Sequence, residues 1–565
     1  MERPKFTPKH LAADAVLDYP PLSGRNAQPW IPIITCPANF PIELFEIAIS
    51  QLIHHPEYNS TLILRSEVVE DVTEDFPSSI PSLEGYIPVR NIHRKLLPRR
   101  PTRDAGLEQH CTLYLASDLP SDSDGPPSPS LVLTPIVAPD TPLPYYHPTV
   151  SHLAFRYVSS SQSLRIEALP LAGTPLDFSS RLHRTCLALL ETLHRYGWGA
   201  QTQYKKRVTH DCLVSRETYQ DLYLVMRERH KHLVGEWKEV TDPLKHVFED
   251  IGIATFLILL WKETYEPSSA PNETTTGIKD DYDTEPWKQW PRPPGGFVDL
   301  GCGNGLLTHI LIAEGYFGVG IDLRARLSWS HYPASTQAAL HIEALDPTIY
   351  ATPPCPPDSS TVTETLTKDT ASRLERGCFI IGNHADELTP WIPVLSTLCD
   401  ASGYLSIPCC AWVFDAKYER SRDVPYPLPL NTVEVNSATT NGGTLDPQTE
   451  AITSDTDEHP SQQEILSKFA DSLNLGGDAT NSNSSSYSMY RIWLASLSVH
   501  CGWKIECETL RIPSTRNWAI VGRTRLEHSE EEMEDYKERA VSIVDDVRRR
   551  GMFKTRRPEG KAGDH

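Results

Sequence analysis

The pattern of apolar and polar positions around which the chain is organised lies between residues 297 and 322. Residues 297–300 form a short apolar run that contains one acid, and three glycines follow at alternate positions. Residues 306–313 have the composition of a helix, and residues 318–322 read as a second strand that ends in another acid. A strand, a glycine turn, a helix and a strand together predict one βαβ unit.

Similar patterns on both sides of this unit predict an open α/β sheet with helices on both faces. Further strands are expected at residues 338–345, 377–382, 403–408, 503–508 and 518–522, with the last two as a closing hairpin. Helices are expected within residues 209–265 and at residues 490–500. Asp242 and Pro243 are a typical N-cap and first helical residue, and the helix that they begin is apolar enough to pack against the sheet.

Residues 31–205 predict a separate α+β domain. Apolar residues follow helical spacing over residues 40–53 and again at about residues 179–196. Short apolar runs predict strands at residues 61–64, 111–115, 131–133, 153–158 and 164–169. The last two strands alternate around a serine-rich turn and therefore predict a hairpin. This domain contains no catalytic motif that we recognise.

Polar tracts rich in Ser, Thr, Asn, Asp and Pro interrupt these regions at residues 120–129, 351–370 and 432–487. Such compositions bury too little apolar surface to fold and predict disordered insertions. The expected division of the chain is a flexible N-terminus (1–30), an α+β N-terminal domain (31–205), a helical segment that packs on the catalytic domain (206–266), a linker (267–296), the α/β domain (297–525) with its disordered insertion (432–487), and a charged C-terminal tail (526–565).

Composition narrows the classes of protein that the chain can represent. Its 565 residues, 39% hydrophobic and 22% charged, suit two to four domains with real cores. The formal net charge of −21 argues against a protein that coats nucleic acid over its whole surface. The start has no apolar run typical of a signal peptide, and the longest apolar run, residues 251–261, is too short to span a bilayer. We therefore expect no membrane association.

The twelve cysteines include no C-x-x-C pair. In a long chain without a signal peptide, this usage predicts reduced thiols in the cytosol or nucleus. Cys409 and Cys410 could bind a metal ion, but adjacent cysteines without a second pair are more often buried small residues. No metal site is therefore predicted.

The details of the glycine turn favour S-adenosylmethionine over a dinucleotide as its ligand. A dinucleotide fingerprint that starts at Gly301 would need glycine at position 306, where Leu306 stands. Asp299 would repel a pyrophosphate but suits an ammonium group, and Asp322 is placed to accept hydrogen bonds from a ribose diol. The expected cofactor-binding residues are Asp299, Gly301, Gly303, Gly305, Asp322 and Asn383. A purely structural turn and an NAD site remain the alternatives.

Four polar residues follow the predicted strand 377–382 directly: Asn383, His384, Asp386 and Glu387. Ligands of open α/β sheets bind beyond the carboxyl ends of the strands, where these residues are expected to lie. Capping of the next helix could account for Asp386 but not for all four. Because methyl transfer to a hydroxyl needs alignment and benefits from a base, His384 and Asp386 are the candidate catalytic residues.

Arginines provide the candidate contacts to RNA phosphates. Arg511 and Arg516 lie in the segment 510–517, and Arg324 follows the second acid of the βαβ unit. Surface ion pairs are the alternative role for arginines in such a segment. Two further basic clusters, at residues 227–232 and 548–557, could touch RNA but are more typical of solvated helix faces.

Several of these stretches resemble the tRNA (uracil-2′-O-)-methyltransferases that modify the ribose of uridine 44 in serine tRNAs. The matching segments are residues 242–251, 297–305, 318–329, 381–391, 407–410 and 510–517. The glycine motif is shared by many methyltransferases, whereas the stretches NHADELTPW and RIPSTRN are far more specific. The resemblance implies a Rossmann-like class I methyltransferase sheet, S-adenosylmethionine as cofactor, serine tRNA as partner and a cytoplasmic location. It implies no catalytic base and no oligomeric state.

Two other functions remain open from the sequence. One is an S-adenosylmethionine-dependent methyltransferase that acts on a small molecule or a protein, which the acidic net charge would suit better. The other is a degenerate fold that serves as an RNA-binding scaffold. The second is the weaker alternative because Asp299, Asp322 and all three glycines are intact.

Overall fold

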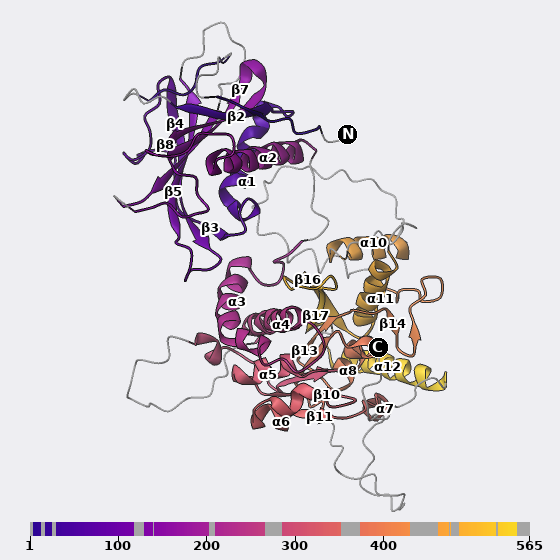
Figure 1. Cartoon of the computed structure of the whole chain (residues 1–565). Coiled ribbons are helices and arrows are strands. Elements are labelled where there is room, and N and C mark those ends of the chain that lie inside the picture. The colour runs from indigo at the N-terminus through magenta and orange to yellow at the C-terminus, as the bar shows by residue number, and fades with distance from the viewer. Residues whose placement is uncertain are drawn as a thin grey trace, which may run out of the picture. The chain divides into compact units, whose positions relative to one another are not determined.

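The chain divides into two compact units, residues 1–205 and residues 206–565 (Figure 1). The computed structural model describes residues 4–12, 17, 19–24, 30–117, 129–138, 141–202, 209–265, 285–351, 373–429, 461–473, 475, 485–526 and 529–550. Within these residues, no helix combines the length and the apolar character that crossing a bilayer requires.

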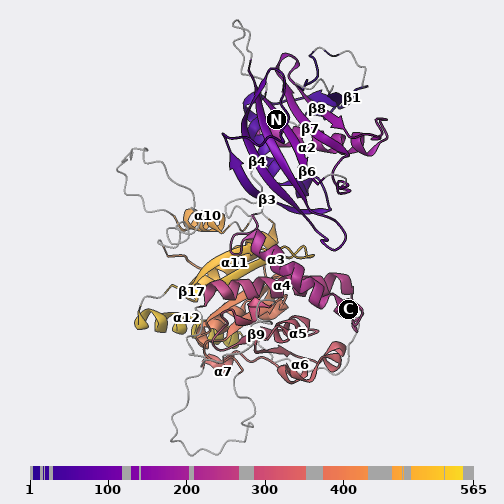
Figure 2. The same ribbon diagram turned by 90° about the vertical axis from the view of Figure 1, so that its left-hand side faces the viewer.

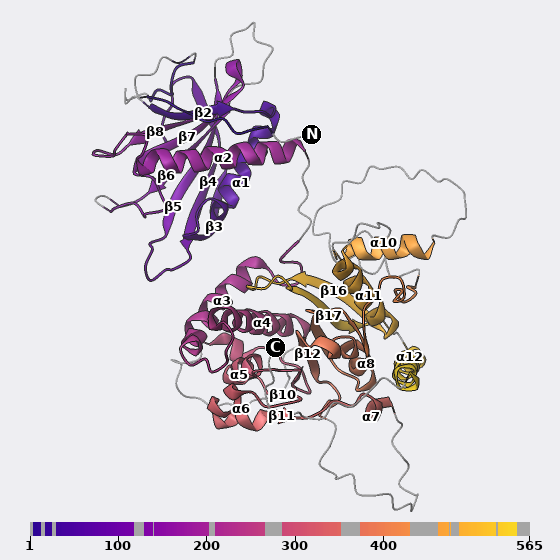
Figure 3. The same cartoon turned by 45° about the vertical axis from the view of Figure 1, so that its right-hand side comes forward.

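The N-terminal unit is an eight-stranded antiparallel sheet with two helices. Its strands are β1 (Lys9–His10), β2 (Ile31–Pro37), β3 (Ile63–Val72), β4 (Tyr86–Pro98), β5 (Leu107–Ala116), β6 (Pro129–Ile136), β7 (Val150–Val158) and β8 (Ser163–Pro170). They follow the order β1-β2-β8-β7-β6-β5-β4-β3. Helices α1 (Phe45–His54) and α2 (Arg181–Gln201) pack on the sheet, and α2 lies across the strands (Figure 3). The predicted hairpin is β7–β8 and is confirmed.

Two features of this unit differ from the expectation. The first residues of the chain were expected to be flexible, but β1 pairs with β2 and the backbone N–H of Leu22 donates to the Glu167 carboxylate at 2.6 Å. The buried side chains of Leu11 and Leu22 anchor this segment. Strand β4 was not predicted from the sequence, because basic residues interrupt its apolar positions. The guanidinium of buried Arg94 is satisfied by the side-chain oxygen of Gln109 at 2.6 Å.

The second unit is built on a seven-stranded mixed sheet with the order β11-β10-β9-β12-β13-β17-β16. Its strands are β9 (Phe297–Leu300), β10 (Gly318–Asp322), β11 (Leu340–Ile342), β12 (Phe379–Asn383), β13 (Gly403–Ile407), β16 (Trp503–Thr509) and β17 (Trp518–Arg525). The first five strands in this order are parallel, and β17 is antiparallel to both of its neighbours. The predicted βαβ unit is confirmed, with α5 (Leu306–Ala313) between β9 and β10.

Helices cover both faces of this sheet. One face carries α3 (Arg216–His230), α4 (Pro243–Thr264) and α5, and α4 lies in front of the strands in Figure 2. The other face carries α8 (Trp391–Leu398), α11 (Ser486–His500) and α12 (Glu530–Arg549). Neighbouring residues of one strand point to opposite cores, as Ile380 and Ile381 do. The parallel strands are therefore buried on both faces, which explains their nearly continuous apolar runs.

The start of α4 follows the expected pattern. The Asp242 carboxylate accepts the backbone N–H of Leu244 at 3.0 Å, and Pro243 is the first helical residue. Further short elements of this unit are η6 (Leu327–His331), α6 (Ala334–Ala339), α7 (Thr348–Ala351), η7 (Asp386–Leu388), β14 (Trp412–Val413) and β15 (Ala416–Lys417).

One expectation about an unstructured segment is wrong for the residues that can be described. Within the insertion 432–487 lies α10 (Gln462–Ser472), which begins with a capping box between Ser461 and Glu464 and buries Ile465 and Phe469. A mostly polar composition hid these apolar positions at helical spacing. Residues 430–460, 474 and 476–484 lie outside the described residues.

The expected linker and tail also contain packed structure. In η5 (Pro286–Gln289), the indole N–H of buried Trp287 donates to the Glu314 carboxylate at 2.7 Å. Helix α12 buries one apolar stripe, which includes Ile543 and Val547, and packs against α8. The tail is therefore an amphipathic helix up to Arg549. Residues 266–284, 551–565 and almost all of the polar tracts 120–129 and 351–370 lie outside the described residues.

Candidate active site

A cavity of about 1180 Å³ opens at the carboxyl ends of the parallel strands. Its lining comes from the turns after β9, β10, β12 and β13, from the first turns of α4 and from residues 514–516. The predicted site residues that line it are Asp299, Gly301, Gly303, Asp322, Arg324, Asn383, His384, Asp386 and Arg516. Gly305 and Arg511 are not among the lining residues.

The glycine turn after β9 is held in a conformation that favours glycine. Gly301, Gly303 and Gly305 have φ angles of 73°, 55° and 74°. The N–H of Gly301 donates to the Ile321 carbonyl at 2.8 Å, which locks the turn against β10. A Cβ on Gly303 would meet no atom within 4 Å, whereas one on Gly305 would lie 3.0 Å from Leu340. Gly303 therefore gives a ligand access to the backbone, and Gly305 allows close packing behind the turn.

Asp299 is a buried acid with half of its hydrogen-bonding capacity unused. One carboxylate oxygen, Oδ2, accepts the Thr308 hydroxyl at 2.9 Å. The other, Oδ1, is buried and has no hydrogen-bond partner among the described residues. Burial, together with the nearby charge of Asp322, raises the pKa of Asp299 to about 7 despite the Thr308 hydrogen bond. A cationic ligand at this position would favour the ionised form.

Asp322 stands at the end of β10 and reaches across the glycine turn. Its carboxylate accepts the backbone N–H groups of Gly303 at 2.9 Å and Arg324 at 3.2 Å. These bonds fix the side chain while leaving lone pairs on both oxygens, because each carboxylate oxygen can accept two hydrogen bonds. Asp322 is therefore oriented at the cavity as a hydrogen-bond acceptor.

The turn after β12 is tied to α4 by two side-chain pairs. Asn383 Nδ2 donates to Asp250 Oδ1 at 3.1 Å, and His384 Nε2 lies 3.1 Å from Glu249 Oε1. His384 has φ 54° and Asp386 has φ 46°, an uncommon conformation for residues other than glycine. Asn383 Oδ1 is buried and has no partner among the described residues. Uncommon backbone geometry combined with an unused acceptor is typical of a functional site.

The two acids of α4 experience opposite pKa shifts. Burial raises the pKa of Glu249, but its hydrogen bond and charge interaction with His384 outweigh burial, and the net shift is downward. Burial and the charges of Glu249 and Asp299 raise the pKa of Asp250 well above its usual range. The surroundings of Glu249 thus favour its carboxylate form, whereas the surroundings of Asp250 favour its neutral form.

Sequence reasoning missed Glu249 and Asp250 as site residues. Their signal was two adjacent acids inside an otherwise apolar helix, a position where unpaired charges are rare. Arg326 was also missed; it lines the cavity, and its buried Nε has no partner among the described residues.

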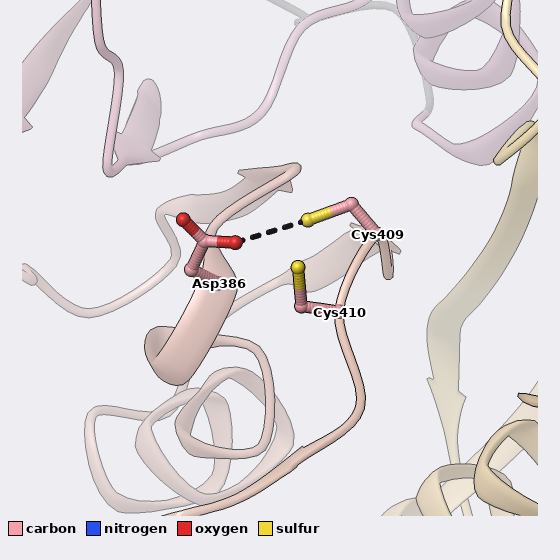
Figure 4. A group of neighbouring side chains, drawn as sticks. All are labelled: Asp386, Cys409 and Cys410. Carbon is pink, nitrogen blue, oxygen red and sulfur yellow. Dashed lines mark hydrogen bonds between the residues drawn. The ribbon is translucent and has the colours of Figure 1, made fainter. Parts of the chain in front are cut away.

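Asp386 faces the two adjacent cysteines that follow β13 (Figure 4). The Cys409 thiol donates to Asp386 Oδ1 at 3.2 Å, and possible metal-ligand atoms of Asp386, Cys409 and Cys410 lie within 4.8 Å of one another. Burial and the charge of Asp386 raise the pKa of both thiols. The three groups could act together as ligands for a cation, but structural zinc sites usually have four protein ligands.

The basic residues fall into paired and unpaired groups. Arg511 forms a two-pronged ion pair with Asp211, at 2.8 and 2.5 Å. In the cluster at residues 227–232, Arg229 and His230 both bind the buried Glu314 carboxylate, at 2.8 and 2.6 Å. By contrast, Arg324 and Arg516 line the cavity and form no ion pair within the described part of the chain.

The residues of the cavity fit S-adenosylmethionine. Asp299 Oδ1 and Asn383 Oδ1 are buried acceptors without partners among the described residues, as a ligand with N–H donors requires. Asp322 can accept hydrogen bonds from a ribose, and the open space at Gly303 admits a ligand to the backbone. Sheet and cavity together define an S-adenosylmethionine-dependent methyltransferase. A family model described as a predicted AdoMet-dependent methyltransferase matches residues 213–278 and 280–347.

The particular family follows from the whole chain. A model described as the TRM44-like, N-terminal bet v1-like domain matches residues 8–207. A tRNA (uracil-O(2)-)-methyltransferase of Neurospora crassa is 32% identical over 92% of this chain and 92% of its own length. The protein of that name from Schizosaccharomyces pombe is 34% identical, with 90% and 87% covered. The chain belongs to the family of tRNA (uracil-O(2)-)-methyltransferases, which confirms the resemblance. No solved structure matches it.

Proposed function

We propose that this chain transfers a methyl group from S-adenosylmethionine to the ribose 2′-hydroxyl of a uridine in tRNA, at position 44 of serine tRNA. Family membership supports the reaction, and one observation carries it: two unused buried acceptors, Asp299 Oδ1 and Asn383 Oδ1, beside a glycine turn. On this proposal the sheet is a Rossmann-like class I methyltransferase sheet, and the enzyme works in the cytoplasm.

The cofactor would be held from the β9, β10 and β12 ends of the sheet. Asp299 and Asn383 would bind its ammonium group, Asp322 its ribose hydroxyls, and the glycine turn would approach it with bare backbone. Bound S-adenosylmethionine supplies a methyl group on a sulfonium, which is a good leaving group. The chain then has to position the ribose oxygen, exclude water and accept a proton.

His384 is the candidate base that the geometry supports best. Its Nε2 faces Glu249 Oε1, and its Nδ1 has no hydrogen-bond partner in the described part of the chain. With the Nε2 proton held by Glu249, Nδ1 can accept the proton of the ribose hydroxyl as the oxygen bonds to the methyl carbon. The Glu249 carboxylate then stabilises the imidazolium. Asp386 is the second candidate base. Arg324 and Arg516 are the candidate phosphate contacts, and Arg511 is not among them because Asp211 already occupies its guanidinium.

Methylation of unmodified tRNA transcripts by the purified chain tests this proposal. Nucleoside mass spectrometry should detect 2′-O-methyluridine in serine tRNA, and replacement of uridine 44 by cytidine should remove the product. We expect His384→Ala to lower the rate by about 100-fold to 10,000-fold, the usual contribution of general base catalysis. Glu249→Gln should also lower the rate and shift its pH profile while S-adenosylmethionine affinity stays unchanged.

Two outcomes would contradict parts of this proposal. Methylation of small molecules or proteins without any tRNA product would overturn the proposed substrate. Wild-type rates in both His384→Ala and Asp386→Ala would exclude both residues as the base.

A further inference from the structure

A second feature of the cavity rim involves an arginine that is stacked on a tyrosine. The guanidinium carbon of Arg516 lies 3.8 Å from the centre of the Tyr487 ring. Tyr487 belongs to the first turn of α11, and its hydroxyl donates to the carbonyl of Pro408, which follows β13. Arg516 is exposed and lines the cavity, so the stack holds a cation at the rim.

A buried arginine lies one helical turn beyond Tyr487. The side chain of Arg491 is nine-tenths buried, with 4% of the residue exposed, and its guanidinium carbon lies 4.0 Å from the Trp518 ring centre and 5.1 Å from that of Tyr487. Its Nη2 donates to the Ser488 hydroxyl at 3.3 Å. Its Nε and Nη1 are buried without any hydrogen-bond partner among the described residues.

Neither cation forms an ion pair with a carboxylate in the described part of the chain. Burial, with the nearby charge of Arg516, lowers the pKa of Arg491 to about 10, so it remains charged at neutral pH. Burying an unpaired charge is costly, and proteins normally pair such groups or let them neutralise. Arg511, in the same 510–517 segment as Arg516, is exposed and forms an ion pair with Asp211. The guanidinium groups of Arg491 and Arg516 therefore have no anionic partner within the described residues.

We propose that Arg516, Tyr487 and Arg491 form a phosphodiester-binding site at the rim of the cavity, which receives the RNA backbone beside the target ribose. This site rests on the proposed function, because every ribose 2′-hydroxyl in an RNA chain has a phosphate as its immediate neighbour. Arg516 contacts the phosphate oxygens through its planar fork of donors. Arg491 is a positioning residue. Its positive charge lies behind the Tyr487 ring, where the low polarity of the buried surroundings strengthens its attraction to an anion.

Salt dependence of tRNA binding by the full-length protein tests the site. For the wild type, the logarithm of the affinity for an unmodified serine tRNA transcript should fall linearly with the logarithm of the KCl concentration. Arg516→Ala should weaken binding and reduce the magnitude of this slope by about 1, which is the change expected when one phosphate contact is lost. Arg511→Ala is the matched control from the same segment, and we expect it to retain the slope. S-adenosylmethionine affinity, measured by calorimetry, should be unchanged in both variants.

A double-mutant cycle tests the role of Arg491. Arg491→Gln should weaken tRNA binding several-fold in the wild type and have much less effect when Arg516→Ala is present, because the two cations act on one phosphate. An unchanged slope in Arg516→Ala, or an equal loss in Arg511→Ala, would overturn the site while wild-type tRNA methylation still supports the proposed function. Absence of tRNA binding and methylation in the wild type would overturn both.

Discussion

The two units treat a buried carboxylate in opposite ways. In the N-terminal sheet, Glu167 is fully buried and is satisfied within the unit by Arg156 at 2.7 Å and by the Leu22 N–H at 2.6 Å. In the second unit, Asp299 is equally buried, but the described residues offer it the Thr308 hydroxyl and no cation. The first acid completes a stable core. The second leaves an acceptor that a ligand can complete, which is why it marks the site.

The largest expected effect is on the free energy of unfolding, and it distinguishes Glu167 from Asp299. Glu167→Gln should destabilise the protein by about 3 to 5 kcal/mol, because it leaves the buried Arg156 charge without its counter-ion. Asp299→Asn removes no ion pair, so the free energy of unfolding of this variant should stay within about 1 kcal/mol of the wild-type value. Urea unfolding measures both values.

Asp299→Asn should instead weaken S-adenosylmethionine binding by about 100-fold, the equivalent of one charge-assisted hydrogen bond to a buried group. Calorimetry measures this affinity, and Glu167→Gln below its unfolding transition is the control that keeps cofactor binding. Equal cofactor affinity in Asp299→Asn and wild type would remove Asp299 from the site.

Local and long-range interactions explain which parts of this comparison the sequence could predict. The bounds of α5 and β10 follow from the sequence because glycines, apolar runs and flanking acids act within a few residues. The contact of Glu249 with His384 could not be predicted, because it depends on how α4 packs over the end of the sheet. The placement of β17 between β13 and β16 is likewise a long-range pairing without a local signal.

Proton binding by Asp299 predicts a smaller, pH-dependent effect. Its folded-state pKa is raised from 3.8 to about 7, so the stability that the neutral acid provides is complete at low pH and is lost as the pH rises through about 7. The ammonium of the cofactor favours the ionised acid, so affinity should rise about tenfold between roughly pH 6 and pH 8. Calorimetry at both pH values measures the change, and Asp299→Asn should lack it. A wild-type affinity that falls over this range would contradict the assigned role.

The smallest effect concerns the helix that carries the second pair of acids into the cavity. Asp242 caps α4 through the Leu244 N–H, and Asp242→Ala should reduce the free energy of unfolding by about 1 kcal/mol. Asp242→Asn is the matched control, because asparagine caps helices about as well as aspartate. Cofactor affinity should remain unchanged in both variants, since Glu249 and Asp250 lie two turns further along and are held by His384 and Asn383. If the alanine variant lost cofactor affinity and the asparagine variant did not, the positions of these acids would depend on the helix start rather than on their partners in the β12 turn.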